Sequence, residues 1–438
     1  GTDVYLVVDI GSSSIRCTAF AVAKAPQAAE SDHSTDDRCL SLVPGSVQRV
    51  ATEPFDGGNA DVASIVSGVN DVVDRCIVYL RKLGVRKIAK VGFSSFAMNL
   101  CGVDGDGRVV TPAYTYASVA PTDENGAIGI SHYFSPEETR IHYCHTGTVL
   151  NHPAYASIHL HRYYANEKPR DVYRWTTFCS HIIGLWTGVG VACPVSYSEA
   201  SWWGILNLKR EVCSRCAESQ IGWDQRAVAR LHASFPINAL PKLCDFDEFD
   251  GKVSGEYVAK WPELSCSNIY LGVGDGAAAN IGSALMSSPK RCWPIDNDGS
   301  APVGCITIGT SAAVRVVCVD DCPDSSDNIL TPLWKYRIDK DRILVGGALT
   351  DGGSLVQWFR ESTPFFSKGM NEIVIYFITF LLNKNFLINL VPVVLPFWSG
   401  ERSTGWHVHA SGVISGINRC TSSGDILHGI FEGIAVRL

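Results

Sequence analysis

The 438-residue sequence has no excess of positive charge. Its 44 Asp and Glu residues outnumber its 37 Lys and Arg residues and give a formal net charge of -7. A chain of this charge repels polyanions, so nucleic acid and anionic membrane surfaces are excluded as its main partners. A polyanionic substrate would need a local site that favours negative charge.

A long hydrophobic run is also missing. Residues 373–395 (IVIYFITFLLNKNFLINLVPVVL) are strongly apolar, but Asn383, Lys384 and Asn385 interrupt them. The longest uninterrupted part falls well short of the roughly 20 residues that a membrane-spanning helix needs. We therefore expect a buried helix and strand there and no membrane partner.

Features of secreted or zinc-binding proteins are absent as well. Asp3 stands where a signal peptide would have its basic segment, and the 16 cysteines are scattered through apolar runs such as RCIVYL. These patterns favour a reducing compartment, so a cytoplasmic protein is expected, with an organelle after removal of a transit peptide as the alternative. Cys213–Cys216 and Cys318–Cys322 have no His or Cys partner at zinc spacing, and no metal centre is expected there.

Length and composition predict a globular protein with two domains. Hydrophobic residues make up 46% of the chain and charged residues 18%, and 438 residues exceed one simple core. Residues 61–83 place apolar side chains at helical spacing behind a capping Asp61. Near residue 265 a new series begins in which an apolar strand is followed by a glycine turn and a segment of small residues, as in the first region. The three stretches of this series are YLGVGDGAAAN, CITIGTSAAVRVV and ILVGGALTDGGSLVQWF. Two α/β halves facing a cleft are expected, at 1–262 and 263–438.

The opening stretch DVYLVVDIGSSSIRCTAF combines an apolar strand with an acidic and glycine-serine turn. Asp9 ends the apolar run and Gly11, Ser12 and Ser13 follow it, before a second apolar run. One interpretation is an ordinary hairpin with a polar tip. The other is a phosphate loop, in which backbone N–H groups and hydroxyls hold an anion while Asp9 faces a metal ion. This stretch alone leaves both open.

Two further glycine-centred sites lie in the second region. Asp275 follows an apolar strand and is flanked by Gly274 and Gly276, so its carboxylate could reach a cleft and accept the proton of an attacking hydroxyl. A helix-capping role is the alternative for Asp275. Gly309-Thr310-Ser311 could hold a second phosphate edge, although a tight turn accounts for the same three residues.

The motifs together resemble the FGGY carbohydrate kinase family, with some features of its gluconate and xylulose kinase branch. The match runs in order over nearly the whole chain and rests on DIGSSSIR, HTGTVLNHPAY, GLWTG with VSYSEASWWGILNL, GVGDGAAANIGS, TIGTSAAVR and GERSTGWHVHASGVISG. Each motif is weak alone, but six in order are specific. The resemblance implies an α/β fold of two ribonuclease-H-like (actin/hexokinase-type) domains.

It also implies in-line transfer of the ATP γ-phosphoryl group to a hydroxyl of a sugar, polyol or sugar acid, with Mg²⁺ as cofactor. By this resemblance Asp275 is the general base and contacts the substrate, and Asp9 lies on the Mg²⁺ side. The residues expected at the ATP phosphates are Gly11, Ser12, Ser13, Arg16, Gly309, Thr310 and Ser311. A homodimer is left open.

The sequence departs from the family pattern at the expected sugar site and at its end. Phe96 and Met98, with Asn99 beside them, stand where relatives usually have a Gln or His, and Tyr116 and Ser118 fall where they have a Trp-x-Asp. Of these, Phe96, Met98, Asn99 and Ser118 are predicted to contact substrate, with altered discrimination because one polar partner changes selectivity strongly. Relatives also continue with a Gly-rich adenosine-binding segment beyond FEGIAVRL, a departure compatible with a truncated or alternatively spliced product or with a faulty gene model.

Two other functions are therefore kept as alternatives. One is a truncated or catalytically weak pseudokinase that binds a sugar or a protein partner, favoured by the substituted sugar positions. The other is an actin-like assembling ATPase, disfavoured by GERSTGWH and SYSEASWWG. Packing is expected for Trp202 and Trp203, and an ion pair with Glu401 is one candidate role for Arg402.

Overall fold

The structure of the chain is a computed structural model that describes residues 3–24, 38–118, 134–150, 152, 154–165, 171–209, 211–212, 219–287, 304–319, 333–362 and 391–438. It divides into two compact units. The first comprises Gly1–Arg291, Val319–Cys322 and Tyr336–Ile343, and the second comprises Cys292–Cys318, Pro323–Lys335 and Leu344–Leu438. Cys213–Cys216, Cys322 and most of the apolar segment 373–395 lie outside the described residues.

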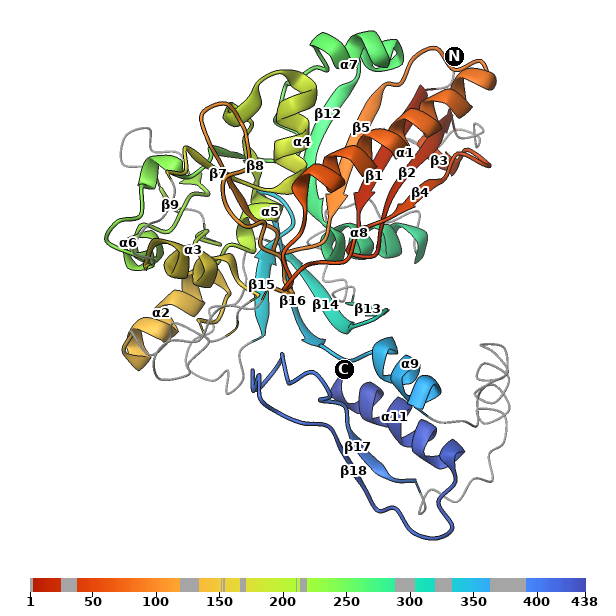
Figure 1. Cartoon of the computed structure of the whole chain (residues 1–438), viewed down its shortest axis with the longest axis vertical. Coiled ribbons are helices and arrows are strands. Elements are labelled where there is room, and N and C mark those ends of the chain that lie inside the picture. The colour runs from red at the N-terminus through yellow and green to blue at the C-terminus, as the bar shows by residue number, and fades with distance from the viewer. Residues whose placement is uncertain are drawn as a thin grey trace, which may run out of the picture. The chain divides into compact units, whose positions relative to one another are not determined.

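A mixed sheet is the centre of the first unit (Figure 1). Its strand order is β12-β5-β1-β2-β3, and β4 also pairs with β2. The strands β1, β5 and β12 are parallel, whereas β2 is antiparallel to β1, β3 and β4. The bounds are β1 (Asp3–Ile10), β2 (Ser14–Lys24), β3 (Arg38–Leu42), β4 (Gln48–Ala51), β5 (Lys90–Ser95) and β12 (Asn268–Gly274).

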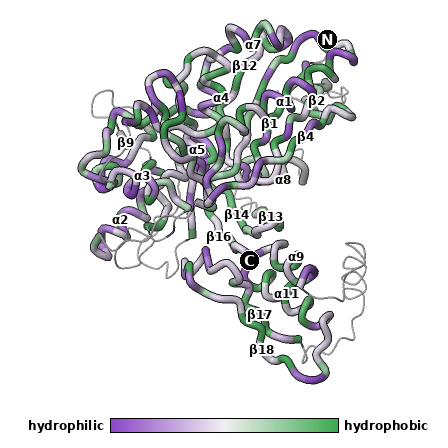
Figure 2. Tube along the Cα trace, in the orientation of Figure 1, coloured by the Kyte–Doolittle hydropathy of each residue, from purple (hydrophilic) through white to green (hydrophobic). Residues whose placement is uncertain are grey.

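Helix α1 (Val62–Lys82) covers one face of this sheet (Figure 1). It begins as predicted, because the Asp61 carboxylate accepts the backbone N–H of Ala63 at 3.0 Å and caps the helix. Apolar residues alternate with polar ones along the helix (Figure 2), and the buried set has the spacing of one helical face: Val62, Ile65, Val69, Val72, Val73, Cys76, Ile77 and Leu80. Each fully buried Val, Leu or Ile contributes about 1.5–3 kcal/mol, so this face anchors the helix to the sheet.

The other elements of the first unit surround this core. They are β6 (Cys101–Val103), α2 (Pro136–Thr146), α3 (Ala156–Ala165), β7 (Arg174–Thr176), α4 (Phe178–Thr187), β8 (Val195–Ser196), α5 (Tyr197–Ser201), β9 (Glu211–Val212), β10 (Ser219–Gln220), α6 (Gln225–Leu231), β11 (Leu243–Cys244), α7 (Gly255–Lys260) and α8 (Asp275–Ser287). Trp203 is fully buried and stacks on Trp223, and Trp202 packs against Tyr336 with 4.0 Å between ring centroids. The expected packing of both tryptophans is confirmed.

A second sheet has the strand order β13-β14-β16-β15, with β13 (Gly304–Ile308), β14 (Ala312–Val319), β15 (Trp334–Arg337) and β16 (Arg342–Leu349). Most of it belongs to the second unit, whereas Val319 and Tyr336–Ile343 are counted with the first. The other elements of the second unit are α9 (Gly353–Ser362), β17 (Val393–Leu395), β18 (Val413–Ser415) and α11 (Ser423–Arg437). A buried cluster joins these helices to β17 through Leu355, Phe359, Val394, Leu427, Ile430 and Ile434.

Strand β12 pairs in parallel with β5 and so belongs to the first sheet, and the first compact unit continues beyond residue 262. Glu401 forms an ion pair with Arg437 near the end of α11, and the role of Arg402 stays a prediction. Within the described ranges, no helix is long and apolar enough to cross a membrane.

Asp245 is a buried carboxyl of the first unit whose pKa the fold controls. The residue is 3% exposed and accepts backbone N–H hydrogen bonds from Phe246 at 2.8 Å and Lys340 at 3.0 Å. Burial raises its pKa to about 6, more than these hydrogen bonds lower it. A carboxyl with a raised folded-state pKa stabilises the fold in its protonated form, below its unfolded pKa of 3.8, and that contribution is lost as the pH rises through 6.

Replacing Asp245 with asparagine is therefore expected to change stability in a pH-dependent way. Asparagine does not ionise, so the variant should gain stability relative to the wild-type protein between roughly pH 4 and pH 7.5, by on the order of 2–3 kcal/mol. Urea denaturation of both proteins at the two pH values measures this difference. An identical difference at both pH values would contradict the assignment.

Candidate active site at the carboxyl edge of the first sheet

Strand register brings three chain segments to one edge of the first sheet. In the parallel pairs, Ile10 at the end of β1 is opposite Ser95 at the end of β5, and Ser95 is opposite Gly274 at the end of β12. The carboxyl ends of parallel strands in α/β sheets are the usual location of ligand sites. The residues that follow these three strand ends are Gly11, Phe96 and Asp275. Two predicted site elements, the first phosphate loop and Asp275, thus share one edge.

The turn after β1 is a hairpin whose tip is exposed. Strands β1 and β2 pair from Asp3 to Ile10, which confirms the hairpin, and Ser12 and Ser13 at its tip are exposed. The Gly11 N–H donates to the Ser14 carbonyl at 3.0 Å. Thr52 holds the turn from outside, because its hydroxyl donates to the Gly11 carbonyl at 2.7 Å and its N–H donates to the Ser13 carbonyl at 3.2 Å. The loop is therefore fixed while its tip remains accessible to an anion.

Asp9 and Arg16 form an ion pair beside this loop. The Arg16 guanidinium lies 3.4 Å from the Asp9 carboxylate, and the two side chains are 45% and 32% exposed. Arg16 also donates to the Ser14 hydroxyl at 3.1 Å. Burial raises the pKa of Asp9, and the positive charge of Arg16 lowers it in part. Exposed ion pairs contribute little stability, so both groups can exchange this partner for a ligand.

Asp275 is the first residue of α8 and its side chain is exposed. Its Oδ1 accepts the backbone N–H of Gly276 at 2.7 Å. This hydrogen bond agrees with the alternative role at a helix N-terminus, and the position at the sheet edge agrees with a role in chemistry. Behind it, Gly274 is buried and its N–H donates to the Ser198 hydroxyl at 3.1 Å.

The four residues predicted to contact substrate are all buried, with exposures of 3–5% for Phe96, Met98, Asn99 and Ser118. Phe96 packs among aromatic rings, and Met98 adopts a left-handed backbone with φ 66°. The Asn99 amide donates to Ser95 and to the Phe96 carbonyl, and it accepts the Phe178 N–H. The Ser118 hydroxyl donates to Asn59 at 2.8 Å. The polar groups of Asn99 and Ser118 already form hydrogen bonds within the chain, so the contact of these four residues with substrate stays a prediction.

The second predicted phosphate loop belongs to the second unit. Gly309, Thr310 and Ser311 are all exposed at the turn between β13 and β14. The turn rests on the start of α9, because the N–H groups of Gly352 and Gly353 donate to the carbonyls of Thr310 and Gly309 at 3.0 and 2.7 Å. The backbone of the loop is thus fixed and its side chains face solvent.

Sequence reasoning missed the polar residues that support the first edge. Thr52 braces the phosphate loop, Ser198 holds Gly274, and Glu199 lies buried between Ser95 and Thr177. The family resemblance includes SYSEAS but implies no role for its individual residues. A Glu in a polar sequence gives no sign of burial, so only the strand register could identify it.

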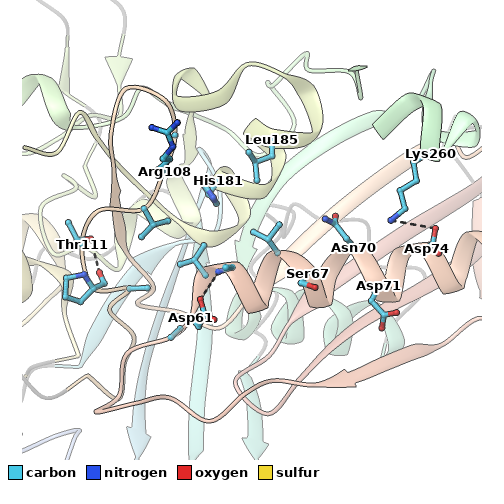
Figure 3. A pocket seen from close by; sticks show the side chains of 18 residues that line it. Asp61, Ser67, Asn70, Asp71, Asp74, Arg108, Thr111, His181, Leu185 and Lys260 are labelled. Carbon is cyan, nitrogen blue, oxygen red and sulfur yellow. Dashed lines mark hydrogen bonds and ion pairs between the residues drawn. The ribbon is translucent and has the colours of Figure 1, made fainter. Parts of the chain in front are cut away.

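A pocket of about 1010 Å³ lies elsewhere on the first unit, along α1 (Figure 3). None of the predicted site residues lines it. Several of its polar groups are already paired within the chain: Asp61 caps α1, Lys260 lies 3.9 Å from Asp74, and Asn70 accepts the Trp186 indole N–H. Figure 3 shows Asp61 at the start of α1 and Lys260 with Asp74 farther along the same helix.

The donor set at the sheet edge suits a hard cation and a phosphate. Asp9 and Asp275 supply carboxylate oxygens, which Mg²⁺ prefers, and Ser12 and Ser13 supply exposed hydroxyls. In the described part of the chain, no three His, Cys, Asp or Glu residues gather as a preformed metal cage. A Mg²⁺ ion that arrives with nucleotide needs only one or two protein carboxylates, so these residues fit it.

Comparison with known proteins finds sugar and polyol kinases. No model of a protein family matches the chain. The glycerol kinase of Symbiobacterium thermophilum is 25% identical over 270 residues, which are 60% of this chain and 45% of that protein. The chain thus spans less than half the length of this curated relative.

Solved structures match over the whole chain. The gluconate kinase from Lactobacillus acidophilus has a TM-score of 0.74 and 22% identity, and the match covers 100% of this chain and 77% of that one. The glycerol kinase of Plasmodium falciparum, solved with ADP, has a TM-score of 0.71 and 16% identity, with the same coverage. The predicted α/β fold of two ribonuclease-H-like domains is confirmed by these matches.

Proposed function

We propose that this chain, which has the fold of the FGGY carbohydrate kinases, transfers the γ-phosphoryl group of ATP to a hydroxyl of a sugar, polyol or sugar acid. The observation that carries the proposal is the strand register that aligns Ile10, Ser95 and Gly274. It puts a fixed glycine-serine loop and an exposed carboxylate, Asp275, on one edge of the sheet. Its relatives are gluconate and glycerol kinases, and one of them was solved with ADP.

In this proposal Asp275 orients the acceptor hydroxyl and takes its proton as the oxygen attacks phosphorus. The carboxylate is suited to this role because it is exposed and its backbone is held by the buried Gly274. Its Oδ1 also accepts the backbone N–H of Gly276 at 2.7 Å, which orients the carboxylate. General bases contribute about 10²–10⁴-fold to a rate.

The phosphates are held by the two glycine loops. Ser12 and Ser13 lie at the exposed tip of the first loop, where the nearby Arg16 guanidinium adds positive charge. In the second unit, Gly309, Thr310 and Ser311 present a comparable exposed turn. Positioned donors of this kind stabilise charge on a transferring phosphoryl group.

Asp9 would hold Mg²⁺, with Asp275 as the other carboxylate near the same edge. When bound, the ion neutralises phosphate charge and orients the nucleotide. Asp9 is suited to this role because its side chain remains 32% exposed beside the loop. Its ion pair with Arg16 would be exchanged when the nucleotide binds.

Turnover by the purified chain tests the proposal. ADP release would be coupled to NADH oxidation with ATP, Mg²⁺ and a panel of polyols, pentuloses and aldonic acids, and thermal shifts would be recorded with the same compounds. We expect ADP release that requires one class of acceptor. Stabilisation by an acceptor without turnover would overturn the kinase proposal in favour of a sugar-binding protein, and no response to ATP or any acceptor would leave only the fold.

A further inference from the structure

A short serine-rich segment braces the end of β12. The Ser196 hydroxyl donates to the Gly272 carbonyl at 2.5 Å, and the Gly274 N–H donates to the Ser198 hydroxyl at 3.1 Å. These two bonds hold the last three residues of the strand, directly before Asp275. The segment therefore fixes the backbone from which the proposed base projects.

Glu199 extends this brace to the neighbouring strand. The residue is 4% exposed, and its carboxylate accepts the hydroxyl of Ser95, at the end of β5, at 2.8 Å. The other oxygen accepts the hydroxyl of Thr177, which precedes α4, at 2.7 Å. One buried carboxylate thus ties the end of β5 to the start of a core helix.

The Glu199 carboxylate accepts hydrogen bonds from two hydroxyl groups, and each hydroxyl oxygen accepts a hydrogen bond in turn. The Asn99 amide donates to Ser95, which donates to Glu199. The Ser180 N–H donates to Thr177, which donates to the other carboxylate oxygen. An ionised carboxylate accepts both hydroxyls, whereas a protonated one would need a new acceptor for its own proton. The geometry therefore matches the charged form.

The Glu199 carboxyl group is closely packed against strand β12. A Cβ atom at Gly272 would lie 2.8 Å from the Glu199 carboxyl carbon and 2.5 Å from the Cβ of Cys179. The carboxyl group is thus pressed against the backbone of β12 two residues before its end. Any displacement of Glu199 moves the ends of both strands.

We infer that Glu199 is a positioning residue of the proposed phosphoryl transfer, a buried carboxylate that sets the ends of β5 and β12 and thereby the direction of the Asp275 side chain. The inference rests on the proposed function. Glu199 acts through Ser95 and the backbone of β12 and has no contact with the reactants. A displacement of about 1 Å at a reacting group can cost about 100-fold in rate, so such a brace has a measurable effect.

Burial of an ionised Glu199 carboxylate lowers the stability of the fold. Burial raises its pKa, and the hydrogen bonds from Thr177 and Ser95 offset the rise only in part. Two thiols, Cys179 and Cys193, also have raised pKa values, mainly because of burial and in part because of the Glu199 charge. A residue retained only for stability would not carry such a cost, whereas groups that serve a site often do.

The test compares Glu199→Gln with Asp245→Asn, a second buried carboxyl of the first unit with a raised pKa, whose oxygens accept hydrogen bonds from Phe246 and Lys340 rather than from Ser95 and Thr177. Glutamine keeps the length but accepts only one of the two hydroxyls. We expect kcat to fall on the order of 10- to 100-fold with KM for ATP and acceptor unchanged within about twofold. The Asp245→Asn variant should keep wild-type kcat. Both variants should melt, at about pH 8, no lower than the wild-type protein.

Hydrogen exchange separates this inference from the proposed function. Faster exchange of the Gly272–Gly274 amides in Glu199→Gln, but not in Asp245→Asn, is expected whether or not the chain is an active kinase. If wild-type turnover is absent while exchange changes as stated, the proposed function fails and the brace stands. Unchanged kcat and unchanged exchange in Glu199→Gln would overturn the inference, as would equal losses of kcat in both variants.

Discussion

Replacing Asp275 with asparagine is expected to lower kcat by about 10²–10⁴-fold, which is the usual contribution of a general base. Asparagine keeps the size of the side chain and can still accept the Gly276 N–H hydrogen bond, so the fold should persist. ATP binding should be retained, because the phosphates are assigned to other residues. Steady-state kinetics and ATP titration of the variant measure the two effects separately.

The control must account for the other role of Asp275, at the start of α8. Glu137 occupies the first turn of α2 and is exposed, so Glu137→Gln removes a comparable charge from a helix N-terminus. Such charges contribute about 0.3–1 kcal/mol to stability and nothing to chemistry. If Asp275→Asn loses no more activity than Glu137→Gln, Asp275 is only a helix-start residue and the assignment is wrong.

Gly11→Ala is expected to raise KM for ATP by about tenfold, the equivalent of losing one hydrogen bond of about 1.4 kcal/mol. A Cβ atom at Gly11 would lie 2.7 Å from the Ser14 carbonyl oxygen, which belongs to the backbone of the same turn. The turn must therefore open, the hydrogen bond from Gly11 to Ser14 is lost, and Ser12 and Ser13 move. Initial rates at varied ATP measure the change.

Gly222→Ala is the matched control for this prediction. No described atom outside its immediate neighbours lies within 4 Å of the added Cβ, and its φ is outside the left-handed region. It should leave KM for ATP unchanged. If Gly11→Ala also leaves KM unchanged while thermal melting confirms that it is folded, the hairpin tip is an ordinary turn and not a phosphate loop.

Local features of the fold could be predicted from the sequence because short-range patterns determine them. The hairpin over Asp3–Phe20 follows from two apolar runs around a glycine-serine turn, and α1 follows from helical spacing behind Asp61. The strand before Asp275 and the helix after it were predicted in the same way.

Long-range pairing could not be predicted, and the missed parts of the site depend on it. The pairing of β12 with β5 brings Asp275 to the same edge of the sheet as the first loop. The burial of Asn99 and Glu199 follows from hydrogen bonds to residues 79 and 104 positions away in sequence. Polarity alone predicts exposure for both residues, so their burial and the roles that follow from it could not be inferred from the sequence.

The central claim is that the carboxyl edge of the first sheet carries phosphoryl transfer with Asp275 as base. The most direct measurement is mass spectrometry of the acceptor after incubation with ATP, Mg²⁺ and either the wild-type protein or Asp275→Asn. The account predicts that one sugar, polyol or sugar acid gains a single phosphate group with the wild-type protein and stays unmodified with the variant over the same time. Equal phosphorylation by both proteins, or none of any acceptor by the wild-type protein, would contradict it.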